Sequence, residues 1–220
     1  MNPNSGTILM SEADHRIANN LALLAGLVRS QAAAIGKKGK AHTAAETHFL
    51  LDGISARISM IAQIHRRIAL SPDSNIVALG PHLREICDGF VAAFSSELQP
   101  VHVDYRLGEC LVPAKFVQPL TLIVCELLLN ALKYAHPAHA PLKFGVSCEE
   151  RKGDLVLTID DDGVGLPEGL DSATDGDFGF RAIRRMCAQI EASLDVQSSS
   201  LGTSFEIAVW GIAVPSAQTA

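Results

Sequence analysis

The chain has 220 residues, of which 48% are apolar and 19% are charged. These proportions are typical of a globular protein with a buried core and exclude an intrinsically disordered chain. The formal net charge of −6 argues against a general nucleic-acid binder, because such proteins carry a basic surface for the phosphates. The nearest approach to a basic run, at 36–40, is Gly-rich and is better interpreted as a solvated loop.

The five cysteines contain no C-x-x-C pair and no histidine at metal-ligand spacing, so the sequence predicts neither a metal site of that kind nor a disulfide. Buried thiols are expected where a cysteine lies within an apolar helical pattern, as do Cys87, Cys125 and Cys187. No stretch approaches the roughly 20 apolar residues that cross a bilayer, and the first six residues are too polar for a signal peptide. We therefore expect a soluble, cytoplasmic protein without a membrane span.

Residues 11–70 have a helical pattern. A first stripe runs in alternating steps of four and three residues, with Asp14 and Gln31 in its two polar positions; its apolar members are Met10, Ile17, Leu21, Leu24, Val28 and Ile35. Residues 36–40 interrupt it. A second stripe follows and ends before Ser71-Pro72-Asp73; it consists of Leu50, Ile54, Ile58, Ile61, Ile64 and Ile68.

Two amphipathic helices joined by a short loop form a helical hairpin, which cannot cover both of its apolar stripes by itself. Pairing two hairpins in a four-helix bundle would bury the stripes, so we predict a homodimer. In the alternative arrangement the hairpin packs only on the rest of its own chain. The predicted domains are 1–73, the helical hairpin through which the chain would dimerise, and 74–220.

From residue 76 onward helices and strands mix. The predicted order is α-β-α-β-β-α-β-β, with elements at 81–94, 101–105, 115–135, 142–148, 155–159, 179–191, 193–197 and 204–209. This order favours an α/β sandwich, within an α+β chain, whose helices cover one face of a mixed sheet. The segment has neither a P-loop nor a strand–G-x-G-x-x-G–helix motif.

The first chemical pattern lies on the long helix at 115–135. Glu126 and Asn130 are four residues apart, and Lys133 and Tyr134 continue the stripe one turn later. Asparagine and glutamate can organise Mg²⁺ and its waters while lysine faces phosphate. From this helix by itself, a ligand-facing stripe and an ordinary solvent face remain equally open.

The second chemical pattern, at the end of the strand 155–159, favours a ligand-facing stripe over an ordinary solvent face. An apolar strand runs into Asp160-Asp161-Asp162 and then Gly163-x-Gly165, a turn in which backbone can approach a ligand closely. A carboxylate there can accept a hydrogen bond from an exocyclic amine such as that of adenine. A calcium loop is a poor alternative, since the later ligand positions of an EF-hand are absent.

Two further elements follow. Gly179 opens a helix whose N-terminal amides can hold phosphate, and Gly202-Thr203 opens the last strand. In this order the four elements resemble the N, G1 and G2 boxes and the final Gly-Thr of the GHKL ATPases. That superfamily includes histidine kinases, Hsp90-like chaperones, gyrase-type topoisomerases and MutL-like proteins.

The resemblance implies a Bergerat-type domain at 74–220 that binds ATP and Mg²⁺. It implies that Asn130 holds the metal, that Asp161 reads adenine, and that the glycines shape the pocket and lid: Gly163, Gly165 and Gly179. Asp177 departs from the family pattern, because it stands where the G2 box often has its first glycine. A carboxylate near the phosphates would weaken ATP binding by charge repulsion.

Among the members of this superfamily, the N-terminal helical hairpin favours the histidine kinases. Glu12, His15 and Asn19 are spaced by three and four residues and so share one helix face. With Arg16 they resemble the phosphoacceptor box of the His-Arg-x-x-Asn histidine kinases, which are related to the HWE kinases. The resemblance extends over residues 12–209, and the short 165–179 segment agrees with that family's abbreviated lid.

The resemblance implies that His15 attacks the γ-phosphate of ATP and that a response-regulator aspartate then receives the phosphoryl group. Glu12 would orient His15 or take its proton, and Asn19 would position water for the phosphatase direction. About ten residues precede the first helix and about ten follow the last strand, which leaves little room for a sensor. The chain is thus a piece of a larger kinase, a stand-alone kinase, or a histidine phosphotransferase or receiver phosphatase with a degenerate ATP domain. An anti-sigma factor of the same superfamily would not need the His15 hairpin.

Overall fold

The computed structural model describes residues 76–94, 100–137, 140–167 and 178–212, together with single residues between 25 and 62. The chain divides into two compact units, Met1–Ala62 and Gln63–Ala220. The predicted domain boundary at 73–74 lies outside the described residues.

In the first unit, every described residue except Thr43 is helical. Thr47 donates its backbone N–H to the Thr43 carbonyl at 3.0 Å, the spacing of one helical turn. Ile58, which belongs to the second predicted apolar stripe, is 49% exposed in the single chain. The predicted break at 36–40 lies outside the described residues.

The second unit contains three helices and seven strands among its described residues. In chain order they are β1 (Ile76–Ala78), α3 (Leu79–Phe94), β2 (Val101–Leu107), β3 (Leu111–Pro113), α4 (Ala114–Tyr134), β4 (Leu142–Arg151), β5 (Asp154–Asp161), α5 (Phe178–Gln189), β6 (Ser193–Ser199) and β7 (Gly202–Val209). The predicted order α-β-α-β-β-α-β-β is confirmed. The strands β1 and β3, which pair with each other antiparallel, were not predicted, because three residues are too few to show a periodicity.

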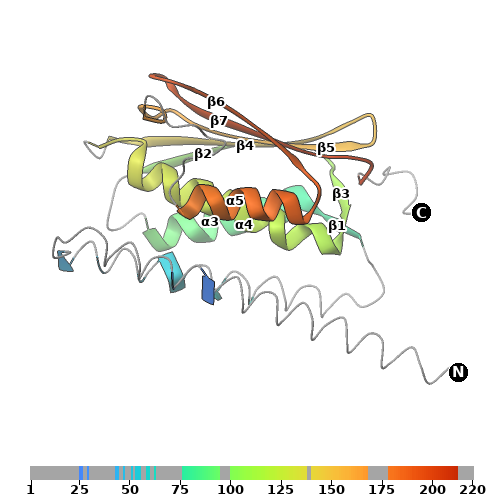
Figure 1. Cartoon of the computed structure of the whole chain (residues 1–220), viewed down its shortest axis with the longest axis horizontal. Coiled ribbons are helices and arrows are strands. Elements are labelled where there is room, and N and C mark those ends of the chain that lie inside the picture. The colour runs from blue at the N-terminus through green and yellow to red at the C-terminus, as the bar shows by residue number, and fades with distance from the viewer. Residues whose placement is uncertain are drawn as a thin grey trace, which may run out of the picture. The chain divides into compact units, whose positions relative to one another are not determined.

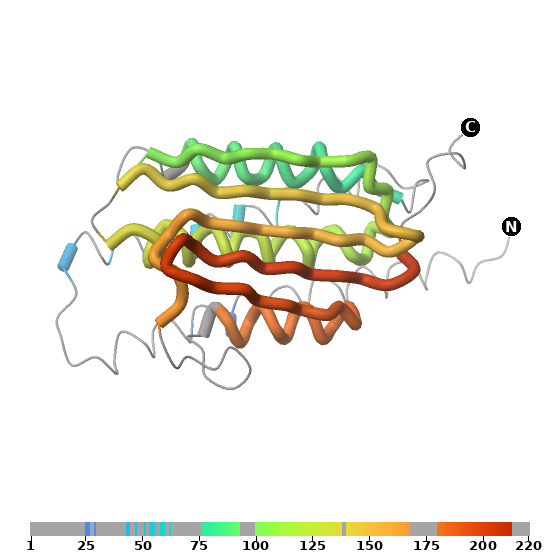
Figure 2. Tube along the Cα trace, turned by 90° about the horizontal axis from the view of Figure 1, so that it is seen from above, coloured from blue at the N-terminus to red at the C-terminus, as the bar shows by residue number. Residues whose placement is uncertain are grey.

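The larger sheet has the order β2-β4-β5-β7-β6. The β2–β4 pair is parallel and the other three pairs are antiparallel, so the predicted mixed sheet is confirmed. Figure 1 shows α3, α4 and α5 together beneath one face of this sheet, and Figure 2 shows the five strands from above with the helices behind them. The unit is therefore a two-layer α/β sandwich.

The core lies between these two layers. Strand side chains alternate, and those of Phe144, Leu155 and Ile207 are almost completely buried. From the helices, Leu127 and Ile183 are equally buried, and the Phe180 and Phe205 rings lie 5.7 Å apart. The alternation leaves the opposite face of the sheet polar and solvated, as in sheets covered on one side.

The parallel pair needs a crossover, because two parallel strands cannot be joined by a tight turn. The chain between β2 and β4 supplies it through β3 and α4. The helix that makes this crossover is also the helix with the polar stripe.

The helix α4 is long and apolar enough, by length and composition, to cross a membrane. This corrects the expectation that no stretch of the chain approaches such a length. Its most apolar window is 78% buried inside the unit, and residues such as Ile123 and Leu128 are completely enclosed. Burial in the sandwich therefore accounts for its composition. Cys87, Cys125 and Cys187 are buried, as predicted.

Candidate functional site

The polar stripe of α4 runs from the core to the surface. Glu126 is 2% exposed, Asn130 and Lys133 are half-buried, and Tyr134, two turns beyond Glu126, is 54% exposed. A stripe that begins in the core is not an ordinary solvent face, which removes that alternative. Within the described part of the chain, no hydrogen bond to the Asn130 side chain is present. A half-buried amide of this kind is available to a ligand.

The three consecutive acids at the end of β5 point in different directions. The Asp160 carboxylate lies over Gly145 on the solvent face of the sheet, 3.7 Å from the Arg106 guanidinium. Asp161 lies on the helix-facing side, because neighbouring strand residues alternate. Of these three acids, Asp161 is the one that the sequence singled out as a site residue, and its side chain lies on the opposite side of the sheet from that of Asp160.

Asp161 lies beside two backbone amides. Its Oδ1 accepts the Gly163 N–H at 2.9 Å, and the backbone of Thr203, its cross-strand partner on β7, also favours the ionised carboxyl. Burial raises the pKa of the Asp161 carboxyl, and these two amides partly oppose the shift. Thr203 is 5% exposed. The structure thus brings Asp161, Gly163 and Thr203 together.

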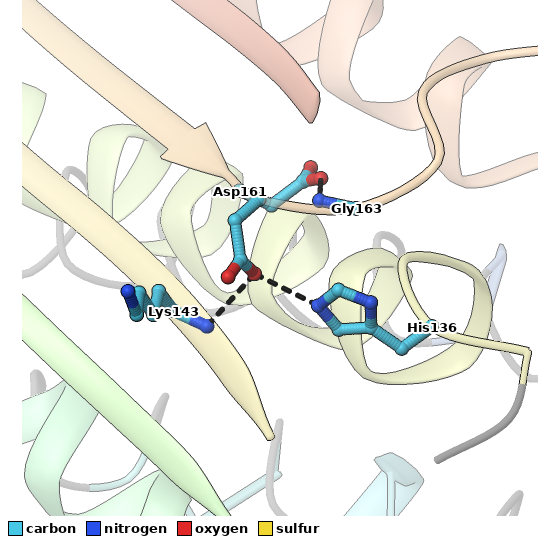
Figure 3. A network of polar contacts seen from close by, with 5 residues as sticks. His136, Lys143, Asp161 and Gly163 are labelled. Carbon is cyan, nitrogen blue, oxygen red and sulfur yellow. Dashed lines mark hydrogen bonds and ion pairs between the residues drawn. The ribbon is translucent and has the colours of Figure 1, made fainter. Parts of the chain in front are cut away.

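Asp162 connects three elements. Its Oδ1 accepts a hydrogen bond from His136 Nε2 at 2.8 Å and from the Lys143 backbone N–H at 2.9 Å (Figure 3). Burial opposes ionisation of Asp162, but these two bonds outweigh it and the pKa of the carboxyl lies below its ordinary value. The sequence did not single out His136 or Asp162 as site residues. A histidine directly after a helix and an acid within a run carry no distinctive spacing.

The turn after β5 lies directly on the end of α4. A Cβ atom on Gly163 would come within 2.5 Å of the Ala135 Cα, so only glycine fits there. The Val164 N–H donates to the Ala135 carbonyl at 2.9 Å. This contact places the turn beside the last residues of the polar stripe, Lys133 and Tyr134.

The same turn is fastened to the hairpin between β6 and β7. Gly165 has φ +77° and lies against the Ser199 carbonyl, where a side chain would collide. The Leu166 N–H donates to Ser198 Oγ at 2.7 Å. Ser198 was not predicted from the sequence, because a serine in a polar edge strand has no marker.

The remaining predicted positions are less informative. Gly179 is the second residue of α5. The predicted catalytic residues of the hairpin and the atypical residue of the G2 box lie outside the described residues: Glu12, His15, Arg16, Asn19 and Asp177.

The described residues fit a nucleotide with its metal. They offer a half-buried carboxylate acceptor, an amide with no bond of its own, and a glycine turn that admits close approach. No group of three or more metal-ligating side chains is present in the described ranges. A magnesium ion held by one protein side chain and by substrate phosphates needs no such group.

A one-sided α/β sandwich with an Asp-x-Gly turn against a polar helix stripe defines a GHKL-type ATPase domain. Residues 117–210 match the family described as histidine kinase-, DNA gyrase B- and HSP90-like ATPases. Residues 12–94 match the family described as histidine kinases, a range that begins at Glu12 and includes His15. Residues 12–94 and 117–210 therefore carry the two kinds of domain found in histidine kinases, as the resemblance of both halves predicted.

Relatives that match most of this chain are also named as histidine kinases. The chain is 25% identical over 202 residues to blue-light-activated histidine kinase 2 of Erythrobacter litoralis, covering 88% of this chain and 54% of that protein. It is 26% identical over 194 residues to the sensor histidine kinase PdtaS of Mycobacterium tuberculosis, covering 86% of this chain and 36% of that protein. The chain therefore spans about half or less of the length of these relatives.

Solved structures share the fold. The histidine kinase domain of a blue-light activated histidine kinase from Erythrobacter litoralis has a TM-score of 0.64 at 23% identity, covering 84% of this chain and 95% of that one. A longer structure of that kinase has a TM-score of 0.67 at 24% identity, covering 91% of this chain and 58% of that one.

Proposed function

We propose that the chain is an ATP-dependent protein histidine kinase that phosphorylates itself on His15 and passes the phosphoryl group to a response-regulator aspartate. The observation that supports this most directly is the arrangement of Asp161 and Asn130. One is a half-buried carboxylate beside two backbone amides, and the other is a half-buried amide to which no described residue makes a hydrogen bond. The family match over 12–94 supports the assignment of His15.

In this proposal the ionised Asp161 carboxylate accepts a hydrogen bond from the exocyclic amine of adenine. Gly163, Gly165 and Gly179 allow the backbone to follow the nucleotide, and Thr203 holds Asp161 from the opposite strand. Lys133 and Tyr134 line the rim, and Glu126 supports the inner end of the stripe. Asn130 would hold Mg²⁺, which spreads the negative charge of the transferring phosphoryl group.

The chemical step forms a bond between an imidazole nitrogen of His15 and the γ-phosphorus and breaks the bond from that phosphorus to the bridging oxygen. ADP leaves with the electron pair, and the imidazole loses its proton to Glu12 or to water. Arg16 follows His15 directly and would face the incoming phosphate. In the second step a receiver aspartate takes the phosphoryl group, and Asn19 would position water for the reverse, phosphatase direction.

The domains at 1–73 and 74–220 would divide this work, with the hairpin as the phosphotransfer and dimerisation part. The half-exposed Ile58 supports a dimer, because at this described position of the predicted stripe an apolar side chain remains accessible in the single chain. We place the protein in the cytoplasm, where ATP and receiver domains occur.

A second candidate function rests on Asp177. A carboxylate in place of the first glycine of the G2 box would repel the phosphates, and the chain would then relay phosphoryl groups between receivers without using ATP.

The test is incubation of the purified chain with γ-labelled ATP and Mg²⁺, beside His15→Ala and His102→Ala. His102 lies on the exposed edge strand β2 and serves as the matched control. Acid-labile label on the wild type and on His102→Ala, with none on His15→Ala, supports the kinase. Absence of both label and ATP binding, with label accepted from a phosphorylated receiver, supports the relay.

A further inference from the structure

The ion pair between His136 and Asp162 is better shielded than the other ion pairs with described exposures. The His136 side chain is 17% exposed and that of Asp162 is 38% exposed. The other histidine–carboxylate pair, His102 with Asp104, is 74% and 63% exposed. Shielding matters because charge-assisted hydrogen bonds lose most of their strength in bulk water.

This ion pair closes a junction of three elements. His136 lies one residue beyond Ala135, the C-cap of α4, Lys143 lies near the start of β4, and Asp162 follows β5. Besides its side-chain bonds, Asp162 donates its backbone N–H to the Lys143 carbonyl at 3.3 Å. The residues on either side of Asp162 are Asp161 and Gly163, the centre of the proposed base-reading turn. A restraint on Asp162 therefore restrains the carboxylate next to it.

We propose that His136 is a positioning residue of the nucleotide site, which through Asp162 aims the Asp161 carboxylate at the exocyclic amine of adenine. The inference rests on the proposed nucleotide binding. His136 does not touch the nucleotide in this scheme and acts through the turn. It makes the site selective for a purine that carries an amine at position 6.

The charges around the Asp161 carboxyl also support a role for His136 in this site. Burial is the main cause of the raised pKa of the Asp161 carboxyl; the negative charge of Asp162 raises that pKa further, and His136 lowers it. A protonated His136 thus offsets the repulsion between the two adjacent carboxylates and favours the ionised Asp161, which can accept a hydrogen bond.

The turn has other attachments, so its fold does not depend on His136. Gly163 packs on Ala135, and the Val164 N–H is bonded to the Ala135 carbonyl. Removal of the imidazole leaves both contacts in place. We therefore expect a change in the aim of the carboxylate and not a loss of the domain.

The experiment compares the full chain with His136→Phe, which removes the donor, and His136→Gln, whose amide restores it. His102→Phe is the matched control on the exposed pair. Calorimetric titration gives the Kd for ATP and for purine riboside triphosphate, which lacks the 6-amine. We expect His136→Phe to weaken ATP about tenfold, leave the desamino nucleotide unchanged, and be largely rescued in His136→Gln.

Equal weakening of both nucleotides, or no weakening, would overturn the positioning role. A wild-type chain that binds neither nucleotide would overturn the proposed function and this inference together, so the two failures are distinguishable. Should His136→Phe fail to fold, the same comparison of the two nucleotides in His136→Ala decides. That variant also removes the donor to Asp162 Oδ1, leaves the bond from the Lys143 N–H in place, and must show the same selective loss for ATP.

Discussion

The backbone of Gly163 rests on Ala135, with room for a hydrogen atom and not for a methyl group: a Cβ on residue 163 would lie 2.5 Å from both Cα and Cβ of Ala135. The atoms in the way belong to the end of a buried helix and cannot swing aside. This contact joins the turn after β5 to the polar stripe of α4.

Gly163→Ala should therefore push the turn away from α4. We expect a loss of about 1–3 kcal/mol in the free energy of unfolding, typical of overpacking, and at least a tenfold higher Kd for ATP. Denaturant unfolding and titration measure the two effects. Gly89→Ala, in α3 with open space around it, is the matched control and should be neutral or slightly stabilising. Equal behaviour of the two variants would contradict the contact.

Asp161→Asn should bind ATP at least tenfold more weakly, because an amide presents one acceptor and repels the exocyclic amine if its NH₂ faces the base. Asp160→Asn serves as the control, since its carboxylate lies on the other face of the sheet beside Arg106. Competition titrations measure both constants. A loss in Asp160→Asn as large as that in Asp161→Asn would show that the acids act as an undirected cluster.

The pH dependence of ATP binding follows from the raised pKa of Asp161. Adenine needs the ionised carboxylate, so affinity should fall as the pH falls through that pKa, at a higher pH than for an ordinary aspartate. The apo domain should respond in the opposite sense: ionising a buried carboxyl destabilises it, so Asp161 should reduce stability as the pH rises through the same pKa. Titrations of the wild type and Asp161→Asn at several pH values test this, and a flat wild-type profile would contradict it.

The contribution of Asp162 to folding stability should have the opposite pH dependence. Its pKa is depressed in the folded chain, so its contribution to stability is present above the ordinary value of 3.8 and is lost as the pH falls through the folded pKa. Because the side chain is 38% exposed, we expect less than about 1 kcal/mol. Asp162→Asn should be less stable than the wild type at pH 7 and should approach it in acid. Urea unfolding at the two pH values measures the difference.

Asn130→Ala should separate binding from stability. Because no hydrogen bond to its side chain is present in the described residues, its removal should change the Tm of the apo chain by no more than about 2 °C. The rise in Tm that ATP with Mg²⁺ produces in the wild type should disappear. Thermal melts with and without nucleotide give both values. A large fall in the apo Tm would instead indicate a structural role.

The predicted dimer can be tested at Ile58. Ile58→Glu places a charge on the open apolar stripe and should shift the chain from dimer to monomer in sedimentation equilibrium. Ser59→Glu, at the next and also exposed position, should remain dimeric. A monomeric wild type would favour a hairpin that packs only on its own chain.

Much of the fold of residues 76–212 could be predicted from the sequence because its elements are long and strongly patterned. The strand at β7 alternates regularly, and α4 has an uninterrupted apolar face. Helix α3 begins at Leu79, two residues before the predicted start at Pro81. Such shifts are expected, because periodicity says little about the residue at which a helix begins.

The site could be predicted where its chemistry depends on residue type at fixed spacing. Asp161, Gly163 and Thr203 lie together in the structure, and a strand end, a glycine turn and the facing strand are all marked in the sequence, while their roles in nucleotide binding stay a prediction. His136 and Ser198 could not be found in this way. Each acts through a contact across more than 25 residues of chain, with Asp162 and with the Leu166 amide respectively, and pairings of that range leave no local pattern.

The parallel pairing of β2 with β4 has a consequence for how the site forms. These strands can pair only after the intervening chain has crossed the sheet, and α4 is the segment that crosses it. In a protein whose binding residues lie on a separate surface loop, that loop could unfold while the sheet and its helices stay folded. Here α4, which carries the proposed ligand-facing residues, is part of the crossover that lets β2 and β4 pair. We therefore expect every molecule that completes its sheet to have its nucleotide pocket already assembled.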